Sequence, residues 1–256
     1  MKIIMLAAGQ GTRLRPITEE IPKCMIQLCD RPIIEWQINN AVASNINEIH
    51  IVGGYRADKI STSGNNLIIN RDYKSTNMAY SLWCAKEHLT DDYIVAYGDI
   101  YYEKNILDRL MESEHDISVV IDMGWYEYWS KRFENPADDA ETLKLGSNGE
   151  IKEIGLPITN IDEVEGQYIG LMRFKNSGAS TLLKTLNSLK EDNIRVNGRS
   201  FNSMYITDVL QHMINIGVDV MAVQINRGWL EVDDINDLEI ARSLVKISEN
   251  ELKMET

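Results

Sequence analysis

Short apolar runs alternate with helix-like stretches along the first half of the chain. Strands are predicted at 2–6, 48–52, 66–69, 93–96 and 117–121, and helices at 32–43, 78–88 and 104–113. The runs are nearly continuous in apolar residues, as expected of strands that are buried on both faces of a sheet. The alternation predicts an α/β fold, namely a Rossmann-like, three-layer and mostly parallel sheet whose ligand site lies at the carboxyl ends of the strands.

The pattern changes after about residue 122. Hairpin-like segments follow around the Asn148-Gly149 turn and at 166–174, because such dipeptides favour a tight reversal between two strands. Helices are predicted near 176–190, 203–216 and 235–248, and the tail from 246 to 256 is expected to be an ordinary charged terminus. We therefore expect one domain in two parts, a core over 1–122 and a small β-rich lid with a C-terminal segment over 123–256.

The chain is acidic, and its charge limits what it can bind. Its 256 residues include 26 Lys and Arg against 39 Asp and Glu, for a net charge of −13. No nucleic-acid partner is expected, since such a protein needs a basic face. No apolar run approaches the roughly eighteen residues of a membrane span, so we expect no membrane contact and a cytoplasmic location. A polyanionic substrate would be repelled without a divalent cation, which makes Mg²⁺ the expected cofactor and Mn²⁺ its alternative.

The loop after the first predicted strand has the composition of a phosphate site. Gly9 and Gly11 allow the backbone to turn tightly and to approach an anion. Arg13 and Lys23 add fixed positive charge to the backbone N–H groups. The loop lacks the Gly-Lys-Ser/Thr ending of a Walker A motif, and Leu14 stands where the dinucleotide fingerprint has its third glycine. The segment therefore predicts a polyphosphate site of another kind.

Two acidic positions are candidates for a hard cation. Asp99 follows the strand predicted at 93–96, and Asp233 lies in the run 231–234 before the last helix. Magnesium usually takes one or two protein carboxylates and fills its remaining positions with phosphate oxygens and water. Each position also has a structural explanation, since Asp99 can be a turn residue and Asp234, in the same run, can be the N-cap of the following helix. The residues alone do not choose between Asp233 and its acidic neighbours in this run, although Asp234 is expected to be the cap.

The stretch from Leu6 to Met25 resembles the signature of a nucleotidyltransferase family that joins a nucleoside monophosphate to a phosphorylated small molecule. Every fixed position of the pattern LAAGxGxRLxPxTxxxPKxM is matched. The resemblance implies a nucleotide-diphospho-sugar transferase-like fold, with metal aspartates from a Gly-Asp pair and a Glu-x-Asp segment, here Asp99 and Asp233. For catalysis we assign Arg13 to the leaving pyrophosphate and Lys23 to the α-phosphate or the attacking phosphate.

A later segment narrows the resemblance to one branch of the family. Asn77 to Leu82 is similar to an Asn-x-x-Tyr-Ser-Leu segment of the branch that acts on phosphocholine and related phospho-compounds. On the residues alone, a helix cap at Thr76 or Asn77 is the commoner explanation. The branch usually uses cytosine, which implies CTP as substrate. The expected nucleotide-binding residues are Leu6, Ala8, Gly9, Gly11, Thr12, Gly53, Asn77, Ser81 and Gly98.

Aromatic residues crowd into 125–129, and Lys131 and Arg132 follow directly. Such a cluster can form a cation–π box for an ammonium group, and it can equally be a plug in the core. With the segment 166–171 it resembles the cytidylyltransferases for phosphocholine, aminoethylphosphonate and phosphoglutamine. A carboxylate-bearing acceptor such as phosphoglutamine would need an added cation, Lys131 or Arg132, whereas choline would need acidic and aromatic lining. The predicted acceptor-binding residues are Trp125, Trp129, Arg132, Glu165, Tyr168, Tyr205, Asp208 and Glu231.

Together these features predict a CTP-dependent cytidylyltransferase. Its partners would be CTP and a small phosphorylated or phosphonate compound, and it would release pyrophosphate and a CDP- or CMP-linked product for capsule or surface-glycan decoration. The alternative is a sugar-1-phosphate nucleotidyltransferase using UTP, dTTP or GTP, against which the segment 77–82 counts. A non-catalytic nucleotide sensor is disfavoured, because Arg13, Lys23, Asp99 and Asp233 are all present. The chain is expected to be a monomer or a homodimer.

Overall fold

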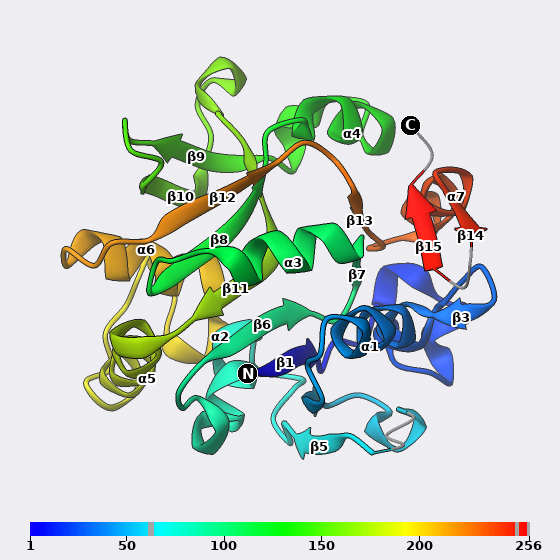
Figure 1. Ribbon diagram of the computed structural model, residues 1–256, viewed down its shortest axis with the longest axis horizontal. Helices are drawn as coiled ribbons and strands as arrows, with labels where there is room; N and C mark the ends of the chain where they lie inside the picture. Colours follow the sequence, from blue (N-terminus) through cyan, green and yellow to red (C-terminus); the bar gives the residue numbers. More distant parts are fainter. Residues whose placement is uncertain (61–63, 249–250, 255–256) are drawn as a thin grey trace.

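A computed structural model of the chain describes residues 1–60, 64–248 and 251–254. Within these ranges a seven-stranded sheet forms the centre of the molecule (Figure 1). Neighbouring strands are parallel, except that β11 is antiparallel to both strands beside it. In order across the sheet the strands are β12 (Met221–Ile225), β8 (Ile117–Asp122), β11 (Gln167–Phe174), β6 (Tyr93–Tyr97), β1 (Lys2–Ala7), β4 (Glu48–Gly53) and β5 (Asn66–Ile69).

All the strands predicted for the first half of the chain are present, and each ends within one residue of its expected end. In β1, Ile3 and Met5 pack into the core on one face of the sheet, and Ile4 and Leu6 pack into the core on the other. The sheet is therefore covered on both faces, which explains why its strands have apolar residues at consecutive positions.

Helices form the two outer layers. Figure 1 shows α1 and α3 crossing the near face of the sheet. That face is covered by α1 (Ile33–Ala43), α3 (Lys104–Glu112), α4 (Trp125–Arg132) and α7 (Ile235–Ser243), and the other face by α2 (Met78–Cys84), α5 (Asn176–Glu191) and α6 (Ile206–Asn215). The predicted three-layer α/β fold is confirmed. No helix in the described part of the chain is both long enough and apolar enough to span a membrane.

The second half of the chain is divided between the central sheet and a hairpin. The hairpin predicted around Asn148-Gly149 is present, since β9 (Glu141–Leu145) pairs antiparallel with β10 (Ile151–Pro157) and Gly149 has a φ of +84°. The prediction of a second hairpin at 166–174 is wrong, because this segment contains β11, which lies between β6 and β8. The expected boundary at residue 122 therefore does not coincide with an edge of the sheet.

The last helix ends earlier than the sequence predicts. Asp234 caps α7 as expected, because its carboxylate accepts the Asp237 N–H at 2.9 Å. The helix stops at Ser243, and β14 (Val245–Ser248) pairs antiparallel with β15 (Glu251–Met254). Leu252 is buried and its carbonyl oxygen accepts a hydrogen bond from Tyr101. The tail is thus packed against the core rather than an ordinary charged terminus; residues 249–250 and 255–256 lie outside the described ranges.

A small two-stranded sheet joins two distant parts of the chain. β7 (Ile100–Tyr102) follows β6, and β13 (Trp229–Glu231) pairs with it antiparallel. The Val232 N–H donates to the Asp99 carbonyl oxygen at 3.1 Å just beyond this pairing. Residues 99 and 233 are thereby brought together at the carboxyl end of β6. A short hairpin, β2 (Gln27–Leu28) with β3 (Arg31–Pro32), connects the first loop to α1.

Candidate active site

The loop after β1 folds back so that Gly11 lies against Lys23. Gly11 has a φ of +62°, and a Cβ at this position would meet Lys23 Cβ at 3.1 Å. The Thr18 hydroxyl donates to the Gly11 carbonyl oxygen at 2.6 Å and fixes this close approach. A Cβ on Gly9 would meet nothing within 4 Å. The glycines therefore have different roles, since Gly11 permits the fold of the loop and Gly9 leaves the backbone open to a ligand.

Four charged side chains from separate segments converge beside this loop. Lys23 Nζ donates to Asp99 Oδ2 at 2.6 Å and also to Asp233 Oδ1. Arg13 Nη2 lies 3.0 Å from Asp233 Oδ2. The Lys23 side chain is only 12% exposed, whereas that of Arg13 is 61% exposed. The geometry thus places two cations and two carboxylates at one point, with Arg13 on the solvent side.

The charges in this cluster stabilise one another. Burial lowers the pKa of Lys23, but Asp99 and Asp233 raise it by more, so its pKa lies above the ordinary value. Burial raises the pKa of Asp233, and Lys23 and Arg13 outweigh this effect and lower it overall. Lys23 and Asp233 are therefore both ionised at neutral pH.

Asp99 and Asp233 are a suitable donor set for a divalent cation. Both carboxylates approach the Lys23 ammonium, so a positive charge already occupies the place where they converge. Two aspartates, with other positions left to phosphate and water, form the kind of site that Mg²⁺ prefers. In the ranges that the structure describes, no group of three or more His, Cys, Asp or Glu side chains is arranged to hold a metal ion. The two aspartates would therefore depend on a substrate for further ligands.

A cavity of about 110 Å³ lies beside the charged cluster. Asn77 caps α2 here, since its Oδ1 accepts the Met78 N–H at 2.9 Å, and it also lines the cavity. Sequence reasoning missed Tyr73 and Tyr97, of which Tyr97 was signalled only by its place at the end of β6. The lining residues are Leu6, Ala8, Gly9, Tyr73, Thr76, Asn77, Met78, Ser81, Tyr97 and Asp99. We call this space the nucleotide cavity, after the residues that the sequence predicts for nucleotide binding.

The other predicted nucleotide-binding residues, Gly11, Thr12, Gly53 and Gly98, do not line this cavity. Gly98 lies behind its wall, where a Cβ would meet the Leu6 carbonyl oxygen at 2.8 Å. The Gly53 carbonyl oxygen accepts the N–H of buried Asn70 at 2.8 Å. Gly53 and Gly98 thus contact other parts of the chain, and neither lines the cavity.

A second cavity, of about 160 Å³, adjoins the first and shares Met78 and Tyr97 with it. Of the predicted acceptor-binding residues it contains Trp129, Tyr168, Tyr205 and Glu231. Asp139 and Glu141, which follow the aromatic cluster in the sequence, also line it, although the predicted site residues do not include them. The lining residues are Met78, Tyr97, Trp129, Asp139, Glu141, Gln167, Tyr168, Ile169, Gly170, Tyr205, Thr207, Glu231 and Asp233. This space, the acceptor cavity, is aromatic and acidic, and it meets the charged cluster at Asp233.

Three other predicted acceptor-binding residues do not line this cavity. Trp125 is buried against Trp129, with ring centroids 5.9 Å apart, and thus belongs to the core. Glu165 accepts the Leu145 N–H at the β9–β10 hairpin. Asp208 is 1% exposed and its carboxylate accepts the Tyr205 N–H at 2.9 Å in a capping box at the start of α6. These three side chains are occupied by packing, hairpin or capping contacts, so the prediction that they line the acceptor cavity is corrected.

Arg132 also lies outside the cavity, because it anchors the acidic segment. Its guanidinium donates to the two Asp237 carboxylate oxygens at 2.8 and 3.0 Å, and to Glu231. Asp237 in turn accepts the Asp233 N–H at 2.9 Å. Burial raises the pKa of Glu231 to about 8, although Arg132 lowers it. Arg132 therefore positions Glu231 directly and Asp233 through Asp237.

Glu141 provides a test of the electrostatics of the acceptor cavity. Burial, with Asp208 and Asp139 nearby, raises its pKa from 4.5 to about 7. The folded protein therefore binds more protons than the unfolded chain between about pH 4.5 and 7, and Glu141 lowers stability as the pH rises through this window. Replacing Glu141 with glutamine is expected to raise Tm at pH 8 and leave it unchanged at pH 4 in thermal unfolding. Equal shifts at both pH values would contradict this.

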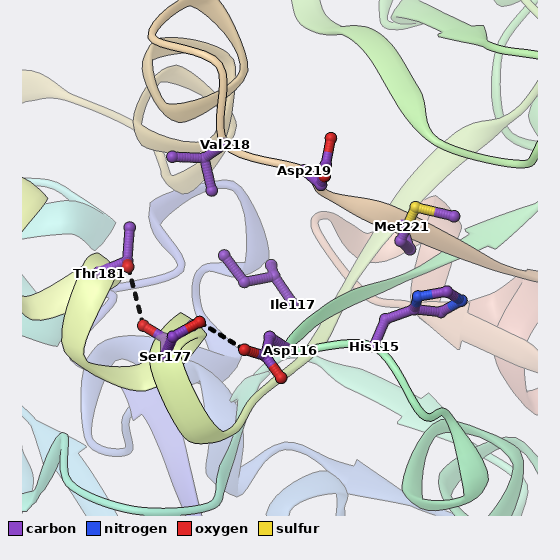
Figure 2. Close-up of a pocket in the computed structure, with 9 residues that line it drawn as sticks. His115, Asp116, Ile117, Ser177, Thr181, Val218, Asp219 and Met221 are labelled. Carbon is purple, nitrogen blue, oxygen red and sulfur yellow. Dashed lines mark hydrogen bonds between the residues drawn. The ribbon is translucent and has the colours of Figure 1, made fainter.

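A larger cavity, of about 460 Å³, lies at the opposite end of the sheet (Figure 2). It is formed at the amino ends of β8 and β12, whereas the charged cluster lies at the carboxyl ends of β1 and β6. The Ser177 hydroxyl donates to Asp116, and the Thr181 hydroxyl donates to the Ser177 carbonyl oxygen at 2.8 Å. These bonds hold the start of α5, and the cavity shares no residue with the site.

Comparisons with known proteins point to one family. Residues 3–136 match the MobA-like NTP transferase domain. The chain is 38% identical over 251 residues to the CTP:phosphoglutamine cytidylyltransferase of Campylobacter jejuni, and this similarity covers 94% of this chain and 98% of that protein. It is 41% identical over 110 residues to the choline-phosphate cytidylyltransferase of Streptococcus pneumoniae, over 41% of this chain and 48% of that protein.

Solved structures show the same fold. The CTP:phosphocholine cytidylyltransferase from Streptococcus pneumoniae has a TM-score of 0.73 at 24% identity and covers 94% of this chain and 97% of that one. A putative glucose-1-phosphate thymidylyltransferase from Bacillus anthracis has a TM-score of 0.72 at 17% identity, with 98% of both chains covered. The predicted nucleotide-diphospho-sugar transferase-like fold is thereby confirmed. The chain belongs to the MobA-like NTP transferase family and is a nucleotidyltransferase.

Proposed function

We propose that this nucleotidyltransferase joins CTP to a small phosphorylated or phosphonate compound that carries an ammonium group. The observation that carries the proposal is the meeting of two cavities at the charged cluster, since Asp99 lines the nucleotide cavity and Asp233 lines the acceptor cavity. The similarity to a CTP:phosphoglutamine cytidylyltransferase over nearly the whole chain supports CTP as the donor. The acidic and aromatic acceptor cavity supports an ammonium-bearing acceptor.

The proposed reaction forms one bond and breaks one. An oxygen of the acceptor's phosphate or phosphonate attacks the α-phosphorus of CTP, and the bond from this phosphorus to the oxygen that bridges to the β-phosphate breaks. Pyrophosphate leaves with that electron pair, and a phosphate acceptor becomes CDP-linked while a phosphonate becomes CMP-linked. No general base is needed, because a phosphomonoester with a second pKa of about 6 is already largely ionised. Catalysis therefore rests on positioning and charge.

The charged cluster supports both of these tasks in the proposal. Lys23 bonds to Asp99 on one cavity and to Asp233 on the other, so its ammonium lies where the attacking oxygen and the α-phosphate would meet. Arg13, on the exposed side of Asp233, is placed to bind the departing pyrophosphate. Asp99 and Asp233 would hold Mg²⁺, which when bound neutralises phosphate charge.

The contacts of Lys23 lead to a prediction for metal binding. Because Lys23 neutralises both aspartates, the nucleotide-free protein should bind divalent cations weakly. Replacing Lys23 with methionine is expected to raise Mn²⁺ affinity without nucleotide by at least about tenfold, since opposite charges near a protein surface interact by about 4 kcal/mol at 4 Å. Titration calorimetry measures this, and adding Asp99→Asn to the variant should remove the gain. Unchanged Mn²⁺ affinity in the methionine variant would contradict it.

Nucleotide choice tests the proposed function. A site that reads cytosine leaves a buried polar group unpaired when the base is wrong, at a cost of about 1–3 kcal/mol per group. Pyrophosphate release is expected to show at least about a hundredfold preference for CTP over UTP in kcat/KM. The candidates for recognising the base are the Ala8 backbone and Ser81, because both residues line the nucleotide cavity. Gly53 is also expected from the sequence to take part, but it does not line this cavity. Equal use of UTP with a sugar 1-phosphate would favour the alternative function.

The biological setting stays a prediction. Use of the product in capsule or surface-glycan decoration, cytoplasmic residence, and a monomeric or homodimeric state are expectations from the sequence.

A further inference from the structure

The two cations that the sequence offers for a carboxylate-bearing acceptor are both engaged elsewhere. Lys131 pairs with Glu127 at 2.8 Å and lines a different cavity, formed with residues of α3 and the segment before β13. Arg132 is buried and bonded to Asp237 and Glu231. An acceptor with a carboxylate would therefore need another positive group in the acceptor cavity.

Arg199 is such a group at the edge of this cavity. Its guanidinium carbon lies over the ring of Tyr205, 4.9 Å from the ring centroid, and Tyr205 lines the cavity. The Arg199 side chain is 37% exposed. Its Nη1 atom bonds to Asp208 Oδ1 at 3.0 Å, and its Nε and Nη2 atoms have no hydrogen-bond partner among the described residues. Arg199 thus keeps two guanidinium nitrogens available to a ligand.

Buried Asp208 holds the guanidinium in position. Its carboxylate also accepts Asn197 Nδ2 at 2.8 Å and the Tyr205 N–H at 2.9 Å, so it is fully bonded. Arg199 is therefore restrained on one side by an ion pair and on the other by an aromatic ring. A cation held in this way loses less conformational freedom when it binds an anion.

Acidic groups line the acceptor cavity beside Arg199. Glu141 and Asp139 line the acceptor cavity, and Glu141 is close enough to Arg199 for the arginine's charge to act on it. A positive group at the edge of the cavity and a negative group in its lining therefore lie near each other. An α-amino acid has the matching arrangement, because its carboxylate and ammonium are attached to the same carbon.

We propose that Arg199 binds the carboxylate of an α-amino-acid acceptor, while Glu141 binds its ammonium group. The inference rests on the proposed function and specifies its acceptor class as phosphorylated α-amino acids. A choline-type acceptor has no carboxylate, so Arg199 would contribute only a like charge near its ammonium. Arg199 is thus a specificity residue that the sequence motifs do not mark.

The test combines two acceptors with three variants. Steady-state kinetics with CTP are measured for phosphoglutamine and for its analogue without the α-carboxylate. Arg199→Met is expected to raise KM for phosphoglutamine by about tenfold to a hundredfold, the loss expected for a charge-assisted hydrogen bond. KM for CTP and turnover of the analogue should be unchanged. Arg199→Lys should recover part of the loss, and Arg195→Met, at an exposed arginine of the same loop, should behave as wild type.

The outcomes separate this inference from the proposed function. Equal loss on both acceptors in Arg199→Met would indicate a structural role and overturn the inference, as would a wild-type preference for phosphocholine over phosphoglutamine. In both cases turnover of CTP would leave the proposed function standing. If the wild type turned over CTP with none of these acceptors, the proposed function would fail, and the inference with it.

Discussion

Replacing Asp233 with alanine is expected to lower kcat by at least about a thousandfold. Its carboxylate bonds to Lys23 and Arg13, lines the acceptor cavity, and is one of the two proposed for the cation. Loss of one preorganised electrostatic group typically costs 10²–10³ in rate, and this change disturbs several at once. Pyrophosphate release at saturating substrates measures kcat, with circular dichroism to verify the fold. Asp99→Ala is expected to behave in the same way.

Asp234 provides the matched control in the next position. It caps α7, so Asp234→Ala should cost about 1 kcal/mol of stability and lower Tm, with kcat within about twofold of wild type. Comparable loss of activity in the two variants would show that the segment as a whole, rather than Asp233, is required. Full turnover in excess chelator would contradict the cation proposed at Asp99 and Asp233.

Replacing Lys23 with alanine is expected to lower kcat by about 10²- to 10³-fold while KM for CTP changes much less. The ammonium of Lys23 is nearly buried between the two cavities, where the proposed reaction would move charge from the attacking oxygen to the leaving pyrophosphate. An interaction that strengthens in the transition state affects kcat rather than KM. Rates over a range of CTP concentrations separate the two constants.

Two arginines of the first loop serve as comparisons for Lys23. Arg13→Ala should lower kcat at least about tenfold, because its guanidinium, beside Asp233, is proposed to bind the pyrophosphate. Arg15 is exposed in the same loop, and Arg15→Ala should leave kcat near the wild-type value. If Lys23→Ala changed only KM, Lys23 would merely bind substrate. Loss of the folded circular dichroism spectrum would assign Lys23 a structural role instead.

The central strands could be predicted because burial on both faces of the sheet requires apolar residues at consecutive positions, and this pattern is visible in the local sequence. In β1, the residues Ile3 to Leu6 are apolar whichever face they point to. β11 could not be placed in the same way, since nothing in its own sequence specifies its neighbours. Its Gly170, with a φ of +83°, resembles a turn residue, but a Cβ there would meet the Tyr97 ring at 2.6 Å. The glycine therefore allows close packing within the sheet rather than a reversal.

The residues of the candidate site differ in the same way, because the sequence predicts some of them and not others. Lys23, Asp99 and Asp233 lie at strand ends and loops that a motif marks, and the pairing of β7 with β13 brings them together. The acceptor cavity depends instead on how the β9–β10 hairpin and α6 pack over the sheet. Whether Asp208 faces a ligand or bonds to Arg199, and whether Glu141 lies in the cavity, is decided by that packing. This packing cannot be predicted from the local sequence.

Phosphorus NMR of a single reaction tests the central claim most directly. With CTP, phosphoglutamine and Mg²⁺, the enzyme is expected to convert the CTP signals into two products in equal amounts. These are inorganic pyrophosphate and a species with two coupled phosphorus atoms, as required for a CDP-linked compound. Absence of CTP turnover with phosphoglutamine, phosphocholine and aminoethylphosphonate, together with turnover of UTP and a sugar 1-phosphate, would contradict the account.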